Sequence, residues 1–292
     1  MIKLGLVGEG IAKSQSPDLH ERLGASLGLP VRYDLVDSLG VADFDFPAAI
    51  QTLRAEGYLG TNVTFPFKEK AAQLADIRGE GVLRVGTANT LLFDAEGLRA
   101  ENTDYTGFIS AYRHSFGDQP AGEVLLIGAG GVGRAVACAL GELAVSHVYI
   151  LERDTMRAEN LSRDLSTMGI NATCITPEQA QQGLPNWQGV VNCSPIGHIN
   201  HPGCPIDTSG LGSQHWVFDA VYIPAHTELL NAADQAGAKT LSGVDLFVFQ
   251  GVDAFRFFTA SCITPEKIDP HVMPLRTHYI EQLVNSPTRA MP

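Results

Sequence analysis

The chain has 292 residues, and its 20 basic and 32 acidic side chains give a formal net charge of −12. So acidic a chain does not attract a phosphate backbone, which argues against a nucleic-acid partner, while an apolar share of 45% is typical of a folded globular protein. No apolar run approaches the roughly 18 residues of a membrane span, and no signal peptide is recognisable at the start, so we expect no membrane partner.

Strand and helix patterns alternate over the first hundred residues. Ser16 is placed to cap the first helix, with Pro17 at its first position. Residues 88–93 and 98–101 are predicted to form a hairpin around the turn at residues 94–97. The pattern predicts strands and helices in this chain order: strand 2–7, helix 17–27, strand 31–35, helix 47–56, strand 58–63.

A domain boundary is predicted at residues 105–120, where a helix over 106–116 ends at Gly117-Asp118-Gln119-Pro120. A second alternating series then follows: strand 123–127, helix 133–143, strand 147–151, helix 157–168, strands 189–192 and 216–219, and a helical tail over 265–282. This alternation predicts an α/β fold with parallel sheets and two domains, a first one over residues 1–105 and a second one over 106–259.

The five cysteines are odd in number and widely spaced, in a chain long enough to bury a core without disulfides. We therefore expect reduced thiols and a cytoplasmic protein. Cys193, His198, His201 and Cys204 lie close in sequence, but their spacing matches no structural zinc pattern, so no metal is expected.

A glycine-rich turn joins the strand at 123–127 to the helix that follows it. Its residues are Gly128, Ala129, Gly130, Gly131, Val132 and Gly133, and the acidic Glu152 follows 19 residues after the last glycine, at the end of the next strand. Glycines permit a tight turn and a close approach of the backbone to a pyrophosphate, and the helix N-terminus offers free N–H groups. The pattern predicts a Rossmann-type dinucleotide-binding domain.

Glu152 bears on the choice of dinucleotide. A carboxylate here accepts hydrogen bonds from the ribose hydroxyls of NAD and repels the 2′-phosphate of NADP. Asp154 adds a second negative charge, whereas Arg153 and Arg157 are able to pair with that phosphate. The two carboxylates favour NAD as the cofactor, with NADP left as a possibility.

Four polar clusters stand out before residue 105: residues 14–17, 62–68, 86–90 and 101–104. Three of them fall at or just beyond the ends of predicted strands, where open α/β sheets bind ligands. Their hydroxyls, amides, one ammonium and one carboxylate suit a small polyhydroxylated carboxylate. Taken singly, Ser16 is explained by a helix cap, Asn89 by a turn and Lys68 by a solvated surface.

In these clusters the sequence resembles the shikimate dehydrogenase family, which includes the quinate/shikimate dehydrogenases. The resemblance implies two α/β domains, the first binding substrate, with an active-site cleft between them, and C-terminal helices of about residues 260–292 that pack back on the first domain. The matching strings run in family order over nearly the whole chain: Ser14–Pro17, 62–69, 88–90, 102–104, Gly128–Gly133, 192–197 and 250–255.

The family pattern implies roles for single residues. Lys68 and Asp104 correspond to the catalytic pair, and Tyr222 to a residue that faces the cleft. The substrate-contacting positions correspond to Ser14, Ser16, Thr64, Asn89, Asp104 and Gln250. One departure is at residues 152–157, where NADP-using members carry Asn-Arg-Thr-x-x-Arg and this chain has acids in place of Asn and Thr. That departure is more similar to NAD-using quinate/shikimate dehydrogenases.

The implied reaction oxidises a ring secondary alcohol to a ketone, with hydride passing to the nicotinamide. A lysine is protonated at neutral pH, so a Lys68–Asp104 pair suits proton donation during reduction and orientation of the hydroxyl during oxidation. Two alternatives stay open: a dehydrogenase of a related ring acid such as an amino-shikimate analogue, and a non-catalytic dinucleotide-binding regulator. Retention of both Lys68 and Asp104 argues against the regulator. A monomer or a homodimer is expected.

Overall fold

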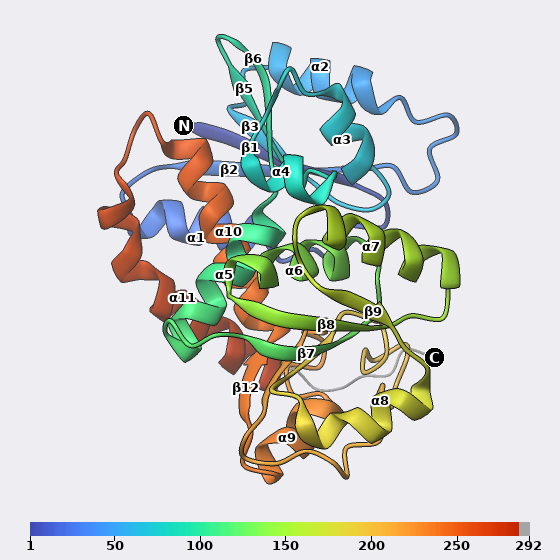
Figure 1. Cartoon of the computed structure of the whole chain (residues 1–292). Coiled ribbons are helices and arrows are strands. Elements are labelled where there is room, and N and C mark those ends of the chain that lie inside the picture. Colours follow the sequence, from blue (N-terminus) through green and yellow to red (C-terminus); the bar gives the residue numbers. More distant parts are fainter. Residues whose placement is uncertain (286–292) are drawn as a thin grey trace. The chain divides into compact units, whose positions relative to one another are not determined.

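The computed structural model describes residues 1–285, and they form two compact units (Figure 1). Unit 1 contains Met1–Gly107 and Val248–Leu275. Unit 2 contains Phe108–Phe247 together with residues 276–285. Each unit has its own sheet with helices on both faces, so the chain has the predicted α/β class.

Unit 1 is built on a six-stranded sheet with the order β2-β1-β3-β5-β6-β4. β1 pairs in parallel with β2 and β3, whereas β5 runs antiparallel to β3 and β6, because the predicted hairpin reverses the chain. The sheet is therefore mixed rather than wholly parallel. Its strands are β1 (Ile2–Gly8), β2 (Val31–Asp37), β3 (Gly60–Val63), β4 (Ile77–Arg78), β5 (Thr90–Asp94) and β6 (Gly97–Glu101).

Helices cover both faces of this sheet, with α2 and α3 on one side and α1 and α10 on the other (Figure 1). Phe46 and Ile50 of α2 are buried in one core cluster with Val7 and Val63 of the sheet. On the other face, the His20 ring stacks on Tyr33 at 4.8 Å. The helices are α1 (Ser16–Ser26), α2 (Phe46–Ala55), α3 (Lys68–Leu74), α4 (Glu80–Val85) and, entering from unit 2, α10 (Gly243–Thr259).

The predicted cap of the first helix is wrong. α1 begins at Ser16 itself, with Gln15 as the N-cap residue and no side-chain cap hydrogen bond. The Ser14 hydroxyl instead accepts a hydrogen bond from the Ser16 backbone N–H at 3.2 Å. The side chain of Ser16 is therefore not needed for capping.

Unit 2 is built on a six-stranded parallel sheet with the order β12-β11-β10-β7-β8-β9. This is the doubly wound arrangement, in which the strand order reverses between β7 and β10 and ligands bind at the carboxyl ends there. The strands are β7 (Gly122–Ile127), β8 (Val145–Leu151), β9 (Ala172–Cys174), β10 (Gly189–Asn192), β11 (Trp216–Asp219) and β12 (Lys239–Ser242).

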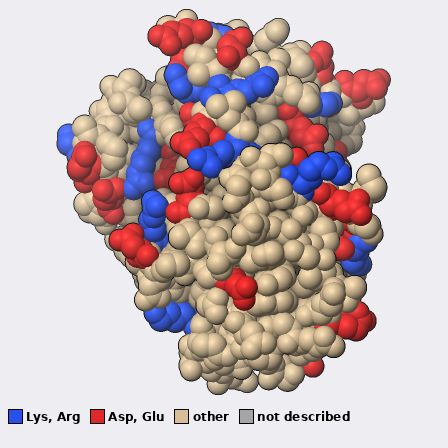
Figure 2. All heavy atoms as spheres, in the orientation of Figure 1, with Lys and Arg blue, Asp and Glu red and all other residues tan. Residues whose placement is uncertain are grey.

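In unit 2, α6 and α7 lie on one face of the sheet, and α8 and α9 on the other (Figure 1). Leu125 and Ile127 of β7 are buried with Leu184 and Leu229 from the side of α8 and α9. In the view of Figure 2, charged side chains are sparse over β7 and β8. The helices are α6 (Gly131–Glu142), α7 (Thr155–Thr167), α8 (Pro177–Gly183), a 3-10 turn (Leu184–Asn186) and α9 (Glu228–Gln235).

Within residues 1–285, three helices carry the chain across the division between the units, one of them α10, which passes from unit 2 into unit 1 after Phe247. α5 (Thr103–Phe116) passes from unit 1 into unit 2 at residue 107, and α11 (Pro265–Asn285) is divided after Leu275. The division differs from the predicted one, because Val248–Thr259 belongs to unit 1 and residues 276–285 to unit 2. The predicted packing of residues 286–292 lies outside the described residues. Within residues 1–285, every helix is too short or too polar to cross a membrane.

Candidate active site

The predicted catalytic pair is formed within unit 1. Lys68 is the first residue of α3, and Asp104 lies in the first turn of α5. The Lys68 Nζ lies 2.6 Å from the Asp104 Oδ2, and the two side chains are only 20% and 11% exposed. A carboxylate in the first turn of a helix is favourably placed in the helix dipole. The geometry is that of a charge-assisted hydrogen bond with restricted access to water.

Asn89, which lies between Lys68 and Asp104 in the sequence, positions the start of α5. Its Oδ1 accepts hydrogen bonds from the Thr103 backbone N–H at 2.7 Å and from the Thr103 hydroxyl at 3.1 Å. Thr103 also donates to the Gln250 Oε1 of α10 at 3.4 Å. The residue that precedes Asp104 is thus tied to two of the predicted substrate residues.

A chain of side-chain hydrogen bonds extends from Asn89 to the two serines. The Asn62 amide donates to the Asn89 carbonyl at 3.2 Å, and its Oδ1 accepts from the Tyr33 hydroxyl at 2.8 Å. The Ser16 side chain also interacts with the Tyr33 hydroxyl, and the Ser14 hydroxyl donates to the Ser16 hydroxyl at 3.2 Å. Unit 1 therefore connects Ser14, Ser16, Asn89 and Gln250 through a single network.

Tyr33 is a residue of this network that the sequence does not single out. Its aromatic ring on β2 is 5% exposed and stacks on His20, like an ordinary core residue. Burial raises the Tyr33 pKa well above its usual value, with the hydrogen bond from Ser16 acting in the opposite direction. Tyr33 therefore stays a protonated donor that orients Asn62.

The remaining predicted substrate residues occupy separate positions. Thr64 directly follows β3, with its N–H bonded to the Val7 carbonyl at 3.0 Å and its carbonyl to the Phe67 N–H at 2.9 Å, so it enters the turn that leads to Lys68. Tyr222 belongs to unit 2, where its ring stacks on Phe247 at 5.8 Å. Burial raises the Tyr222 pKa.

The glycine-rich turn has the strand–turn–helix geometry that its sequence predicts. β7 ends at Ile127, Gly128 has a φ of +92°, and α6 begins at Gly131. A Cβ on Gly133 would lie 2.1 Å from the Gly128 carbonyl oxygen, whereas one on Gly130 or Gly131 would meet nothing within 4 Å. The turn is therefore closely packed at Gly133, whereas the space beside Gly130 and Gly131, the front of the turn, is open. At this open front the first N–H groups of the helix have no intrahelical partner.

The turn lies at the switch point of the sheet, close to the loop that follows β10. A Cβ on Gly128 would meet the Ser194 nitrogen at 2.8 Å. Asn192 holds this loop by donating to the Ile196 carbonyl and to the Asp219 carboxylate, both at 2.9 Å. Burial raises the Asp219 pKa to about 6, although its hydrogen bonds oppose the shift.

Glu152 is held against the glycine-rich turn. Its carboxylate accepts hydrogen bonds from the Ala129 N–H at 2.8 Å and the Asp154 N–H at 3.0 Å. Burial acts to raise the Glu152 pKa, but these two donors together with Arg157 and Arg153 outweigh it and hold the pKa below its usual value. The carboxylate is therefore ionised at neutral pH beside the dinucleotide turn.

Asp154 and Arg157 lie at the start of α7. Asp154 is the N-cap residue and accepts the Arg157 backbone N–H at 3.1 Å. The Arg157 guanidinium lies 3.8 Å from the Asp154 carboxylate, with both side chains about half exposed. Arg153 is exposed. The two arginines are within the same short segment as both carboxylates, as the sequence indicates.

The histidines of the loop after β10 are engaged in local contacts. The backbones of His198 and His201 form an isolated antiparallel β-bridge, and the His198 Nδ1 accepts the Asn200 N–H at 3.1 Å. Burial, together with the neighbouring His201, lowers the His198 pKa. Among residues 1–285, no group of three or more His, Cys, Asp or Glu side chains is arranged to hold a metal ion.

Comparison with known proteins gives consistent relatives over most of the chain. Residues 6–91 match the family model described as the shikimate dehydrogenase substrate binding domain. The quinate/shikimate dehydrogenase (NAD(+)) of Corynebacterium glutamicum strain R is 34% identical over 96% of this chain and 98% of its own length. The shikimate dehydrogenase (NADP(+)) of Arthrobacter sp. strain FB24 is 34% identical over 93% of this chain and 94% of its length.

The structural comparison agrees with the sequence comparison. The structure of quinate dehydrogenase from Corynebacterium glutamicum in complex with NAD matches with a TM-score of 0.88 and 33% identity, over 96% of this chain and 99% of that one. The Thermus thermophilus shikimate 5-dehydrogenase in complex with NADP(H) and shikimate matches with a TM-score of 0.78 and 29% identity, over 94% of this chain and 100% of that one.

Proposed function

The chain belongs to the shikimate dehydrogenase family and is an NAD- or NADP-dependent oxidoreductase, and we propose that it interconverts shikimate with the 3-dehydro ketone, using NAD in preference to NADP. Quinate is a weaker substrate in this proposal, because it carries an additional hydroxyl on the carbon that bears the carboxylate and needs extra room there. Unit 1 holds the ring acid, and the open front of the glycine-rich turn in unit 2 holds the dinucleotide.

The observation that carries the proposal is the Lys68–Asp104 pair at 2.6 Å. A nicotinamide bound in unit 2 would supply the hydride acceptor when the ring alcohol is oxidised, and the hydroxyl proton must pass to a group within hydrogen-bond reach. In this direction the unprotonated Lys68 amine accepts the hydroxyl proton, and Asp104 fixes the position of the Lys68 Nζ. In the reverse direction, the same lysine donates the proton to the ketone oxygen as it becomes a hydroxyl.

Ser14 and Ser16 are proposed to bind the ring carboxylate, and Asn89, Thr64 and Gln250 the ring hydroxyls. The two short hydroxyls lie 3.2 Å apart at the start of α1, and the Ser16 side chain is not used as a helix cap. The network through Tyr33 and Asn62 holds them in place. A group of prepositioned donors reduces the loss of side-chain freedom when the substrate binds.

Initial rates with shikimate and quinate, each with NAD and NADP, test the proposal directly. We expect the highest kcat/KM for shikimate with NAD. Absence of turnover with both acids, together with measurable NAD binding, would support a non-catalytic regulator. Preferential turnover of an amino-shikimate analogue in the same assay would replace the substrate but keep the reaction type. Equal or better use of quinate would overturn the ranking of the two acids.

The cofactor preference is expected to depend on Glu152 and Asp154. The double variant Glu152→Ser, Asp154→Thr removes both negative charges and leaves Arg153 and Arg157 to pair with the 2′-phosphate. Threonine keeps the N-cap function of residue 154. We expect the ratio of kcat/KM for NAD to that for NADP to fall by about 10- to 100-fold, because a hydrogen bond to a charged group contributes about 1.5–3 kcal/mol.

Adding Arg153→Ala and Arg157→Ala to that double variant provides the matched control. The NADP gain should be lost if the arginines bind the phosphate. A wild-type enzyme that uses NADP better than NAD would show that the role assigned to Glu152 is incorrect.

The carboxylate contact is expected to depend on Ser16. A contact that is equally strong in the ground state and the transition state changes KM rather than kcat. We expect Ser16→Ala to raise the KM for shikimate by about tenfold through the loss of a hydrogen bond to a charged group, with a smaller decrease in kcat. Ser26→Ala, at the other end of α1, is the control and should leave both constants unchanged. A decrease confined to kcat would contradict the assignment.

We also propose a cytoplasmic location and a monomeric or homodimeric state. All five cysteines lie within the described residues and are free thiols, which supports a reducing compartment. Size-exclusion chromatography with light scattering distinguishes the two oligomeric states, and a larger assembly would contradict both.

A further inference from the structure

Unit 2 contains a cavity at the end of its sheet that is opposite to the glycine-rich turn. Its lining includes Trp216 and Lys239, the first residues of β11 and β12, so it lies at the amino ends of the strands. The glycine-rich turn follows the carboxyl end of β7. The volume of the cavity, about 200 Å³, is below the usual range of roughly 300–1,000 Å³ for ligand pockets. It therefore has room for a small ligand only.

One wall of the cavity is aromatic. Tyr112 and Phe116 of α5 meet Trp216 of β11 edge to face or tilted, with ring centroids 5.1 Å and 5.9 Å from Trp216. All three residues are at most 7% exposed. Because so little of each ring is exposed, this wall offers an apolar ligand ring edges rather than open ring faces.

The Tyr112 hydroxyl is a hydrogen-bond donor in this wall. Tyr112 is 1% exposed as a residue, and its hydroxyl oxygen is not among the fully buried side-chain atoms that lack a hydrogen-bond partner in the described part of the chain. Other polar atoms of the wall are engaged: the Trp216 Nε1 donates to the Ala121 carbonyl at 3.0 Å, and the His215 Nε2 lies 2.9 Å from the Leu184 carbonyl. Burial raises the Tyr112 pKa to about 12, so the hydroxyl stays protonated.

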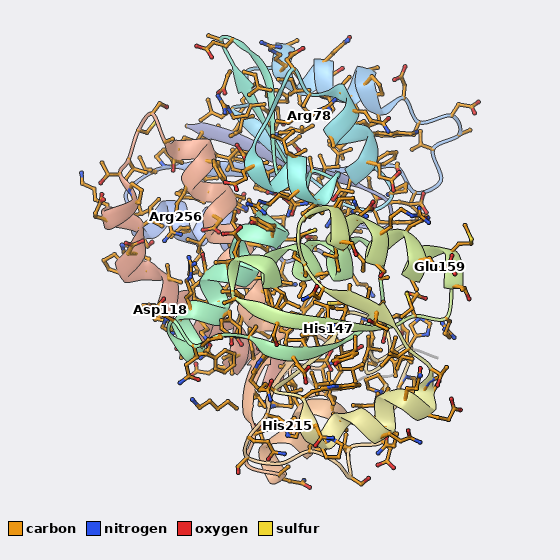
Figure 3. The ribbon with its side chains drawn as sticks, viewed as in Figure 1. Arg78, Asp118, His147, Glu159, His215 and Arg256 are labelled. Atoms are coloured by element: carbon orange, nitrogen blue, oxygen red, sulfur yellow. The ribbon has the colours of Figure 1, made fainter. Side chains whose placement is uncertain are left out.

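The charge of the lining favours an anion. His215, which is labelled in Figure 3, belongs to the lining. Asp118, also labelled there, precedes Gln119 in the sequence but does not line the cavity. The lining consists of Tyr112, Phe116, Gln119, Pro120, Gln188, Ser213, Gln214, His215, Trp216 and Lys239. It thus contains one lysine and no carboxylate, although the chain has 32 acidic and 20 basic residues. Lys239 has no ion-pair partner in the described part of the chain.

We propose that this cavity is a second ligand site, which binds a small monocyclic carboxylate. The ring packs against Tyr112, Phe116 and Trp216, and the carboxylate accepts hydrogen bonds from the Tyr112 hydroxyl and the Lys239 ammonium. Aromatic burial supplies apolar contact, and the two donors select an acid over a neutral ligand of the same shape. The site is independent of the proposed dehydrogenase reaction.

Benzoate is the probe, and tryptophan fluorescence is the readout. The chain has two tryptophans, so Trp187→Phe leaves Trp216 in the cavity as the single fluorophore. We expect a saturable change with benzoate and at least about tenfold weaker binding of benzamide, which has the same shape without the charge. Calorimetry on the unaltered chain gives the same comparison without a substitution. No saturable binding of benzoate, or equal binding of benzamide, would overturn the proposal.

Two substitutions locate the bound benzoate. Lys239→Met, at an exposed position, and Tyr112→Phe should each weaken binding by about tenfold, because both side chains donate to the charged carboxylate. Ser16→Ala, in the proposed carboxylate site of unit 1, should leave benzoate affinity unchanged. If benzoate affinity falls in Ser16→Ala and not in Lys239→Met, the ligand occupies the substrate site and the cavity is not a site.

Discussion

Lys68→Met is expected to lower kcat with shikimate by about 10²- to 10⁴-fold, the usual contribution of a positioned acid–base group. Methionine keeps most of the volume of the side chain and removes the ammonium that contacts Asp104 at 2.6 Å. If Lys68 only anchored the substrate, KM would rise and kcat would be nearly unchanged. NAD binding should be unchanged, because Lys68 belongs to unit 1 and the glycine-rich turn to unit 2.

Lys70 provides the matched control for this experiment. It lies two residues further along the same helix, where it is exposed and its ammonium is 5.8 Å from the centre of the Phe67 ring. Lys70→Met should therefore leave both kcat and KM close to the wild-type values. A Lys68→Met enzyme with near-normal kcat at saturating shikimate would leave Asp104 as the only candidate for proton transfer.

The pairing itself is tested by adding Asp104→Asn. The amide keeps a polar group next to Lys68 but removes the charge that orients the ammonium, so kcat should also fall. Because the two residues act as one unit, the double variant should lose less than the product of the two single losses. Fully multiplicative losses would indicate that the residues act separately.

The sequence predicts the glycine-rich turn and most of the strands well, because these features are local. A strand, a tight turn and a helix N-terminus follow each other within residues 123–143, and each has a clear residue signature. α10 is not among the predicted helices, because Val244, Leu246, Val248 and Val252 make its sequence predominantly apolar, although Gln250, Asp253 and Arg256 recur at helical spacing. Its assignment to unit 1 from Val248 onward depends on tertiary packing, which no local pattern records.

In the candidate site, too, local sequence patterns do not reveal the contacts between residues that are far apart in the chain. Lys68 and Asp104 are 36 residues apart, and their contact follows from the family resemblance rather than from any spacing. Tyr33 was missed because an aromatic residue in a strand is an ordinary core residue. Only the structure shows that its hydroxyl joins Ser16 to Asn62. Ser16 was assigned to a cap because Ser before Pro is typical of a helix start, and the structure shows it within the helix.

The glycines of the dinucleotide turn should respond to substitution in two distinct ways. A Cβ at residue 133 would lie 2.1 Å from the backbone carbonyl oxygen of Gly128, an atom that cannot move without displacing the turn. Overpacking typically costs about 1–3 kcal/mol, and a clash with backbone belongs at the upper end. We expect Gly133→Ala to lower the thermal midpoint of the ligand-free protein by roughly 6–12 °C, and also to weaken NAD binding.

Gly130→Ala is the matched variant with the opposite expectation for stability. Residue 130 has a φ of −71°, which any L-residue adopts, and an added Cβ would meet nothing within 4 Å. The thermal midpoint should therefore stay within about 2 °C of the wild-type value, since about 0.5 kcal/mol is the usual range at a position without contacts. The open space in front of the turn is where we place the pyrophosphate, so the same methyl group should raise the KM for NAD by at least about tenfold. If Gly130→Ala bound NAD normally, the dinucleotide would not lie against this face of the turn. If Gly133→Ala kept the wild-type midpoint, the close packing of residue 133 against Gly128 would not contribute to folding.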